Sequence, residues 1–112
     1  MFSNEDFIGR HVEDYNNHDL DALVAAFDKD VKIYNLIKQT LLMEGRENIR
    51  EFYTQHFAHP ILYSDVTERI VLGNKIIDKQ TFTSEADNLL INAVTIYNIE
   101  NNLIKEVWLI FE

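Results

Sequence analysis

The sequence predicts an α+β domain in which three N-terminal helices pack on one face of a curved, mostly antiparallel sheet. The first observation is the order of patterns: helical spacing of apolar residues dominates up to residue 57, and strand-like runs fill residues 62–112. The second is the segment Asn88–Glu112, two runs rich in Ile, Val, Leu, Thr and Tyr on either side of an Asn-Asn turn. Neither run alternates cleanly, so we expect this hairpin to lie mid-sheet with both faces covered.

The first helix is expected to begin after Ser3, a good N-cap with Asp6 three residues later as an imperfect capping box. Its apolar stripe consists of Phe7, Ile8, His11, Val12 and Tyr15. Asn16-Asn17-His18 interrupts this helix, and Asp19 is suited to cap a short second one. The stripe of the second helix consists of Leu20, Leu23, Val24 and Phe27.

Asp28-Lys29-Asp30 is predicted to be a turn before a first strand at residues 31–36. Residues 37–44 are ambiguous, although their Leu-Leu-Met is compatible with a short second strand. Gly45 is expected to open a third helix, which Pro60 ends because proline cannot continue it. One face of this helix carries Ile49, Phe52, Tyr53, His56 and Phe57.

The next two strands are predicted at residues 62–72 and 75–84, joined by the two-residue turn Gly73-Asn74. This turn fixes the register. It puts Arg69 opposite Asp78 and Glu68 opposite Lys79, one pair on each face of the hairpin.

Composition bounds the whole chain, residues 1–112, to one domain. The formal charge of −9 disfavours nucleic acid and anionic membranes as partners. No apolar run approaches the ~20 residues of a membrane helix, and the first residues lack the basic start and apolar run of a signal peptide. The absence of cysteine leaves no thiolate chemistry and fits a cytoplasmic protein.

Four segments together resemble the nuclear transport factor 2-like superfamily, in particular its SnoaL-like and ketosteroid isomerase-like members. These segments are residues 15–31, 45–53, 69–78 and 97–108, and the likeness covers nearly the whole chain. The resemblance implies a cystatin-like cone in which the sheet wraps the helices around a pocket. It also implies a homodimer formed through the outer face of the sheet, and chemistry without a cofactor. The fold hosts isomerases, dehydratases, cyclases, hydrolases and binding modules, so it does not name a reaction.

The ketosteroid isomerase pattern of an Asp base, a Tyr and a second, protonated Asp does not carry over. Its base falls on Asn35, which cannot accept a proton, and its oxyanion Tyr falls on His11. The second acid falls near Ala93 or Thr95. A true ketosteroid isomerase is therefore not expected.

Asp78 is the candidate catalytic residue, because an acid among strand residues facing a pocket has its pKa raised by desolvation. The alternative is that Asp78 and Arg69 are only a cross-strand ion pair. The residues expected to line the pocket are His11, Tyr15, Asn35, Tyr53, His56, Arg69, Tyr97 and Trp108. Trp108 has a second interpretation, a dimer contact, since a one-residue slip of its hairpin reverses every side chain.

Tyrosine and tryptophan side chains combine an apolar body with one polar atom, which suits a small apolar ligand carrying an oxygen. No His and carboxylate spacing indicates a metal site. Two hypotheses remain open: a small-molecule-binding SnoaL-like domain with cofactor-free acid-base activity, or a non-catalytic ligand-binding or dimerisation module on the same fold.

Overall fold

Three helices and one six-stranded curved sheet make up the fold, which confirms the predicted α+β class. The computed structural model describes residues 3–58, 62–84, 86 and 88–111. In chain order the elements are α1 (Asn4–Asn16), α2 (Leu20–Ala25), β1 (Phe27–Asn35), β2 (Thr40–Glu44), α3 (Arg46–His56), β3 (Tyr63–Leu72), β4 (Lys75–Ser84), β5 (Leu89–Glu100) and β6 (Leu103–Phe111). The Pro60 stop expected after α3 lies outside the described residues.

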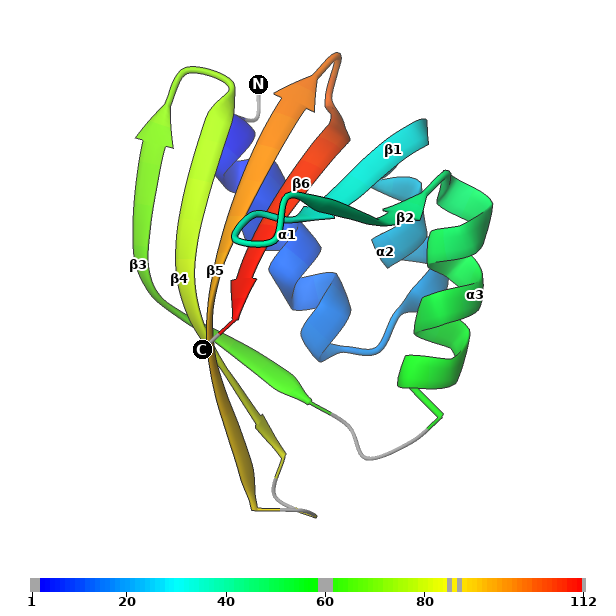
Figure 1. Ribbon diagram of the computed structural model, residues 1–112, viewed down its shortest axis with the longest axis vertical. Coiled ribbons are helices and arrows are strands. Elements are labelled where there is room, and N and C mark those ends of the chain that lie inside the picture. Colours follow the sequence, from blue (N-terminus) through cyan, green and yellow to red (C-terminus); the bar gives the residue numbers. More distant parts are fainter. Residues whose placement is uncertain (1–2, 59–61, 85, 87, 112) are drawn as a thin grey trace.

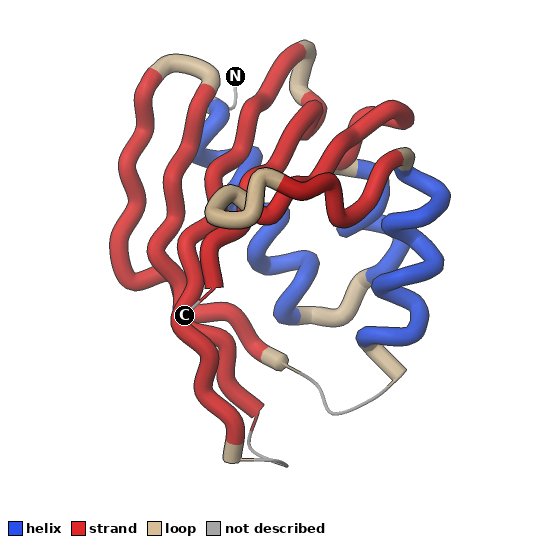
Figure 2. Tube along the Cα trace, viewed as in Figure 1, coloured by secondary structure: helices blue, strands red, loops and turns tan. Residues whose placement is uncertain are grey.

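The sheet has the order β2-β1-β6-β5-β4-β3, so the β5–β6 hairpin lies in its middle as predicted. Strands β3 to β6 form an antiparallel meander, whereas β1 runs parallel to β6. The sheet curls around α1, and α3 stands on the opposite side of α1 from β3 and β4 (Figure 1). All three helices lie on the same side of the strands (Figure 2). A pocket lies between the sheet and the helices.

The helices begin at the residues that their sequences predict. The Ser3 hydroxyl accepts from the Asp6 amide and the Asp6 carboxylate accepts from the Ser3 amide, which completes a capping box. The Asp19 carboxylate accepts from the backbone amide of Ala22 and caps α2. Gly45 precedes α3 with a φ of 89°, in the left-handed region that favours glycine.

Strand β1 begins four residues earlier than predicted, at Phe27 rather than Val31. Phe27 pairs with Ile104 of β6 and is buried, so it belongs to the sheet and not to the second helix. The expected Asp28-Lys29-Asp30 turn is instead an irregularity within β1, where the register with β6 shifts. The Asp28 carboxylate holds this bulge by accepting from the Asp30 amide and from Lys105 Nζ.

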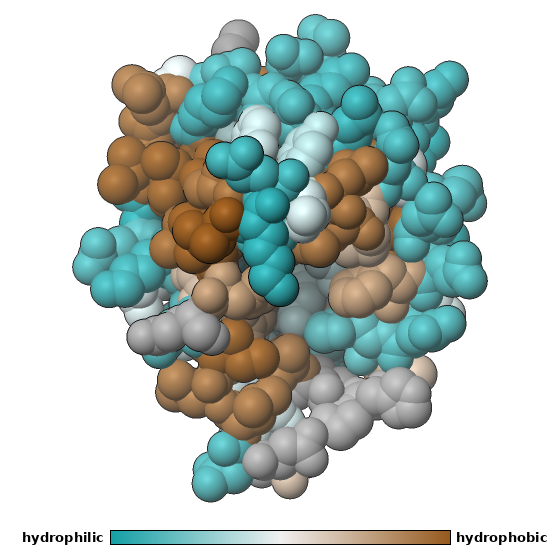
Figure 3. All heavy atoms as spheres, in the orientation of Figure 1, coloured by the Kyte–Doolittle hydropathy of each residue, from teal (hydrophilic) through white to brown (hydrophobic). Residues whose placement is uncertain are grey.

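The two faces of the sheet differ in what covers them. The inner face carries most of the core together with the helices, including Ile8, Ile49, Ile76 and Ile104, each fully buried. Across the outer face runs one apolar row through five strands, which we call the outer row. It consists of Ile70, Ile77, Ile96, Trp108 and Tyr34. Brown, hydrophobic side chains gather over the strands at the left of Figure 3.

Of the helices in the described residues, none combines the length and the apolar character needed to span a membrane.

Candidate functional site

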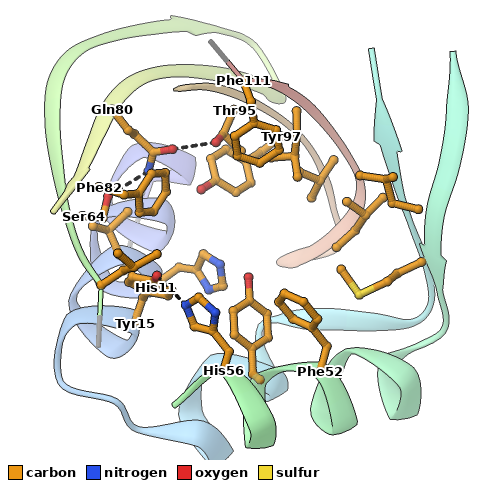
Figure 4. A pocket seen from close by; sticks show the side chains of 18 of the residues that line it. His11, Tyr15, Phe52, His56, Ser64, Gln80, Phe82, Thr95, Tyr97 and Phe111 are labelled. Carbon is orange, nitrogen blue, oxygen red and sulfur yellow. Dashed lines mark hydrogen bonds between the residues drawn. The ribbon is translucent and has the colours of Figure 1, made fainter. Parts of the chain in front are cut away.

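A half-open cavity of about 440 Å³ lies between the sheet and the helices (Figure 4). Its volume falls in the range of small-molecule pockets. Every described element except α2 contributes to its wall. The lining side chains are His11, Val12, Tyr15, Phe27, Ile33, Leu42, Met43, Phe52, Tyr53, His56, Leu62, Ser64, Gln80, Phe82, Ile91, Thr95, Tyr97, Val107, Leu109 and Phe111.

The helices supply one group of polar atoms, which we call the helix cluster: His11 and Tyr15 from α1 and Tyr53 and His56 from α3. Each pair is spaced by four or three residues, so both members share one helix face. The Tyr15 hydroxyl lies 2.9 Å from His56 Nε2, which joins α1 to α3 across the pocket wall. All four are residues that the sequence predicts to line the pocket, and all four lie in this wall.

Burial keeps the helix cluster uncharged. Desolvation lowers the pKa of His11 to about 4, and desolvation together with the charge of His18 lowers the pKa of His56. Desolvation also raises the pKa of Tyr53 to about 12 and raises that of Tyr15 further. At neutral pH the imidazoles are therefore neutral and the phenols keep their protons.

The sheet supplies a second group, the sheet cluster, formed by Ser64, Gln80, Thr95 and Tyr97. All four side chains are buried. Thr95 Oγ1 donates to Gln80 Oε1 at 2.6 Å, and Gln80 Nε2 donates to Ser64 Oγ at 3.1 Å. The Tyr97 hydroxyl also contacts the Gln80 side chain, which partly offsets the burial that raises the pKa of Tyr97. Gln80 is thus the centre of the cluster.

The remaining wall is apolar. Strands β1, β2 and β6 line the pocket only with Phe27, Ile33, Leu42, Met43, Val107, Leu109 and Phe111. In Figure 4 the labelled polar side chains gather on the side of α1, α3 and β3–β5. Among the described residues, no Asp, Glu, Lys or Arg lines the pocket. The site therefore has a polar, uncharged side and an apolar side.

Asp78 and Arg69 face each other in the predicted register, but they lie outside the pocket lining. Arg69 Nε lies 2.6 Å from Asp78 Oδ1 and Nη2 lies 2.9 Å from Oδ2, a bidentate ion pair. Asp78 is fully buried, and the guanidinium lies beside Gly9 of α1. The first turns of α1 thus cover this end of the sheet, and the geometry favours the ion-pair alternative over a catalytic Asp78.

Asn35 and Trp108 also lie outside the pocket lining. The Asn35 side chain turns to the end of β1, where its Oδ1 accepts from the Lys38 amide at 2.9 Å. Trp108 belongs to the outer row and stacks on Tyr34, with ring centroids 6.0 Å apart. The hairpin register therefore turns Trp108 to the outer face rather than into the pocket.

The sheet cluster contains three residues that were not expected from the sequence to line the pocket: Ser64, Gln80 and Thr95. The signal for Gln80 is the period of two along β4, where Ile76, Asp78, Gln80 and Ser84 are buried. Once Asp78 is placed on the inner face, Gln80 must follow it. Among the described residues, no three His, Cys, Asp or Glu side chains come together as a metal site.

Comparison with known proteins gives one family match. A protein-family model described as a SnoaL-like domain matches residues 8–107. No curated protein matches the sequence.

Several solved structures share the fold. An uncharacterized cystatin-fold protein from Novosphingobium aromaticivorans has a TM-score of 0.86 at 20% identity, covering 97% of this chain and 98% of that one. A nuclear transport factor 2-like protein of unknown function from Cytophaga hutchinsonii has a TM-score of 0.83 at 13% sequence identity, covering 100% of this chain and 92% of that one. The third is a hypothetical protein with a ketosteroid isomerase-like fold from Catenulispora acidiphila, solved in complex with trimethylamine. It has a TM-score of 0.75 at 13% sequence identity, covering 92% of this chain and 82% of that one. At these sequence identities the likeness shows a shared fold and nothing more.

Proposed function

Since the chain belongs to the SnoaL-like domain family, we propose that its pocket binds a small, uncharged and largely apolar molecule with at least one hydrogen-bonding oxygen. The observation that carries this proposal is the lining. It offers imidazole, phenol, hydroxyl and amide groups on one side and only hydrocarbon and thioether on the other. No described charged residue is present there to compensate a ligand charge, and an uncompensated charge is costly to bury.

A matched pair of fluorescent probes tests this proposal. N-Phenyl-1-naphthylamine is neutral, and 1-anilinonaphthalene-8-sulfonate has the same ring system with an added anion. We expect the neutral probe to bind more tightly than the anion in a direct titration. Tighter binding of the anion would contradict the proposal.

Two substitutions on β5 locate the probe. Ile91 lines the pocket, and Ile96 belongs to the outer row of the same strand. Both side chains are partly buried. Ile91→Trp should fill the cavity and weaken binding of the neutral probe, whereas Ile96→Trp, the matched control, should leave its dissociation constant unchanged. Equal effects of both substitutions would place the probe outside the pocket and overturn the proposal.

The Tyr15–His56 contact favours a second candidate function, proton transfer on the bound molecule. A neutral His56 is able to accept a proton and a protonated Tyr15 is able to donate one, the two roles of acid-base catalysis. Deuterium uptake at the methyl group of 2-acetylnaphthalene in D₂O, followed by NMR, tests it. Uptake above the buffer rate that His56→Gln abolishes, with the ketone still bound, supports this candidate; no uptake with the ketone bound refutes it.

We also propose that the chain forms a homodimer through the outer row. Ile70 is 60% exposed at one end of this row, and Ile77, Ile96, Trp108 and Tyr34 are only partly covered. Contiguous apolar surface of this kind is typical of protein interfaces. A twofold axis would bury the same row from both subunits.

A further inference from the structure

The hydrogen bonds of the sheet cluster run in one direction, from Thr95 through Gln80 to Ser64. This direction determines which hydroxyl protons remain available to a ligand. Thr95 gives its only hydroxyl proton to Gln80 Oε1. Gln80 Nε2 donates to Ser64 Oγ at 3.1 Å. The Gln80 amide therefore accepts from Thr95 at its oxygen and donates to Ser64 from its nitrogen.

Ser64 consequently accepts at its oxygen and retains its own hydroxyl proton. Tyr97 also retains its proton, because burial raises the pKa of its hydroxyl. Among the described residues, no group accepts a hydrogen bond from either hydroxyl. Both side chains line the pocket and are nine-tenths or more buried, at 8% and 5% exposure. Leaving a buried donor without an acceptor destabilises a fold by about 1–3 kcal/mol. We therefore expect a ligand or a water to accept a hydrogen bond from these hydroxyls.

The position of Ser64 is fixed before any ligand binds. The side chain of Asn16, the last residue of α1, binds the backbone of Ser64 twice. The Ser64 amide donates to Asn16 Oδ1 at 2.7 Å, and Asn16 Nδ2 donates to the Ser64 carbonyl at 2.9 Å. The start of β3 is thereby pinned to α1, and a donor held in place loses little entropy on binding.

We infer that Ser64, oriented by Gln80, and the neighbouring Tyr97 form a subsite for a hydrogen-bond acceptor oxygen, and that the ligand is a neutral carbonyl compound whose C=O points at this wall. This inference rests on the proposed function, because it requires that the pocket binds a molecule at all. A carbonyl oxygen has two lone pairs and no proton, which matches two donors. A carboxylate would bring a charge, and no described Lys or Arg lines the pocket to compensate it.

The experiment compares 2-acetylnaphthalene with 2-isopropenylnaphthalene, in which a CH₂ group replaces the carbonyl oxygen at nearly the same shape. Calorimetric titration should show the ketone binding roughly tenfold more tightly to the unmodified protein, the equivalent of about one good hydrogen bond. Ser64→Ala should remove most of this preference by weakening the ketone alone. The infrared C=O stretch of the bound ketone should move to higher frequency in the same variant.

Two further variants control this comparison. Ser84→Ala removes another buried hydroxyl from the inner face of β4, outside the pocket lining, and should change neither affinity. Thr95→Val removes the donor at the other end of the hydrogen-bonded series Thr95–Gln80–Ser64. It should weaken the affinity for the ketone less than Ser64→Ala does. A larger loss from Thr95→Val than from Ser64→Ala would mean that the hydrogen bonds run the other way, which overturns the inference.

The outcomes separate the inference from the proposed function. If both naphthalenes bind equally well and Ser64→Ala changes nothing, the carbonyl subsite is wrong and the neutral pocket stands. If neither naphthalene binds at concentrations up to their solubility, both are wrong.

Discussion

Removing the charge of Asp78 should destabilise the fold far more than removing that of its neighbour Glu68, and the contrast follows from burial. In the inner pair, Asp78 is fully buried and the Arg69 side chain is 20% exposed. In the outer pair, the Lys79 and Glu68 side chains are 63% and 72% exposed and 4.0 Å apart. The two pairs lie side by side on the same hairpin, so each serves as the control for the other.

The magnitude comes from what each substitution leaves behind. Asp78→Asn leaves the Arg69 guanidinium under α1 without its anion, and breaking a buried pair in this way costs roughly 3–5 kcal/mol. Glu68→Gln leaves Lys79 in water, where an exposed pair contributes at most about 1 kcal/mol. Replacing both members of the inner pair, as Arg69→Met with Asp78→Leu, should recover most of the loss, because no unpaired charge then remains.

Urea unfolding followed by far-ultraviolet circular dichroism measures these differences, at one fixed protein concentration because a dimer would shift the midpoint. Binding of the neutral probe provides the second readout. Folded Asp78→Asn should bind it as the unmodified protein does, since Asp78 lies outside the pocket lining. Equal and small stability losses for Asp78→Asn and Glu68→Gln would refute the buried-pair reasoning, and lost probe binding at unchanged stability would restore a functional Asp78.

Three other predictions address acid stability, activity and assembly. Burial lowers the pKa of His11 from 6.5 to about 4, so as the pH falls the unfolded chain takes up a proton before the folded chain does. The free energy of unfolding should therefore be at its full value above pH 6.5 and fall by about 3 kcal/mol towards pH 4. His11→Phe should flatten this pH dependence, and an unchanged dependence would show that His11 is not its cause. The purified protein should not isomerise a β,γ-unsaturated steroid, because Asn35 stands where the base would be, and turnover that Asn35→Ala abolishes would contradict this. Light scattering at micromolar concentration should give the mass of a dimer. Ile70→Lys should dissociate this dimer, and Val71→Lys, the matched control on the other face of β3, should leave it intact. A monomer mass for the unmodified protein would refute the interface.

Local rules were sufficient for most of the fold. The caps at Ser3, Asp19 and Gly45 and the stripes that follow them located the helices, since capping and helical spacing act within a few residues. The Gly73-Asn74 turn fixed the register that pairs Arg69 with Asp78. The family match over residues 8–107 confirms the resemblance that four sequence segments indicated.

Features that depend on long-range pairing were beyond the local pattern. The parallel pairing of β1 with β6 leaves no mark in either strand, so the early start of β1 at Phe27 was missed. The inward or outward direction of Trp108 depends on the register of a hairpin that is apolar on both faces. The sheet cluster joins β3, β4 and β5, and its hydrogen bonds become visible only when all three registers are known.

Intermolecular NOEs from bound 2-acetylnaphthalene to isoleucine and leucine methyl groups would show on which face of the sheet the ligand binds. We expect contacts with Ile33 and Leu109, which line the pocket from β1 and β6. Contacts with Ile77 and Ile96 of the outer row, without contacts to Ile33 and Leu109, would place the ligand on the wrong face of the sheet and contradict this expectation.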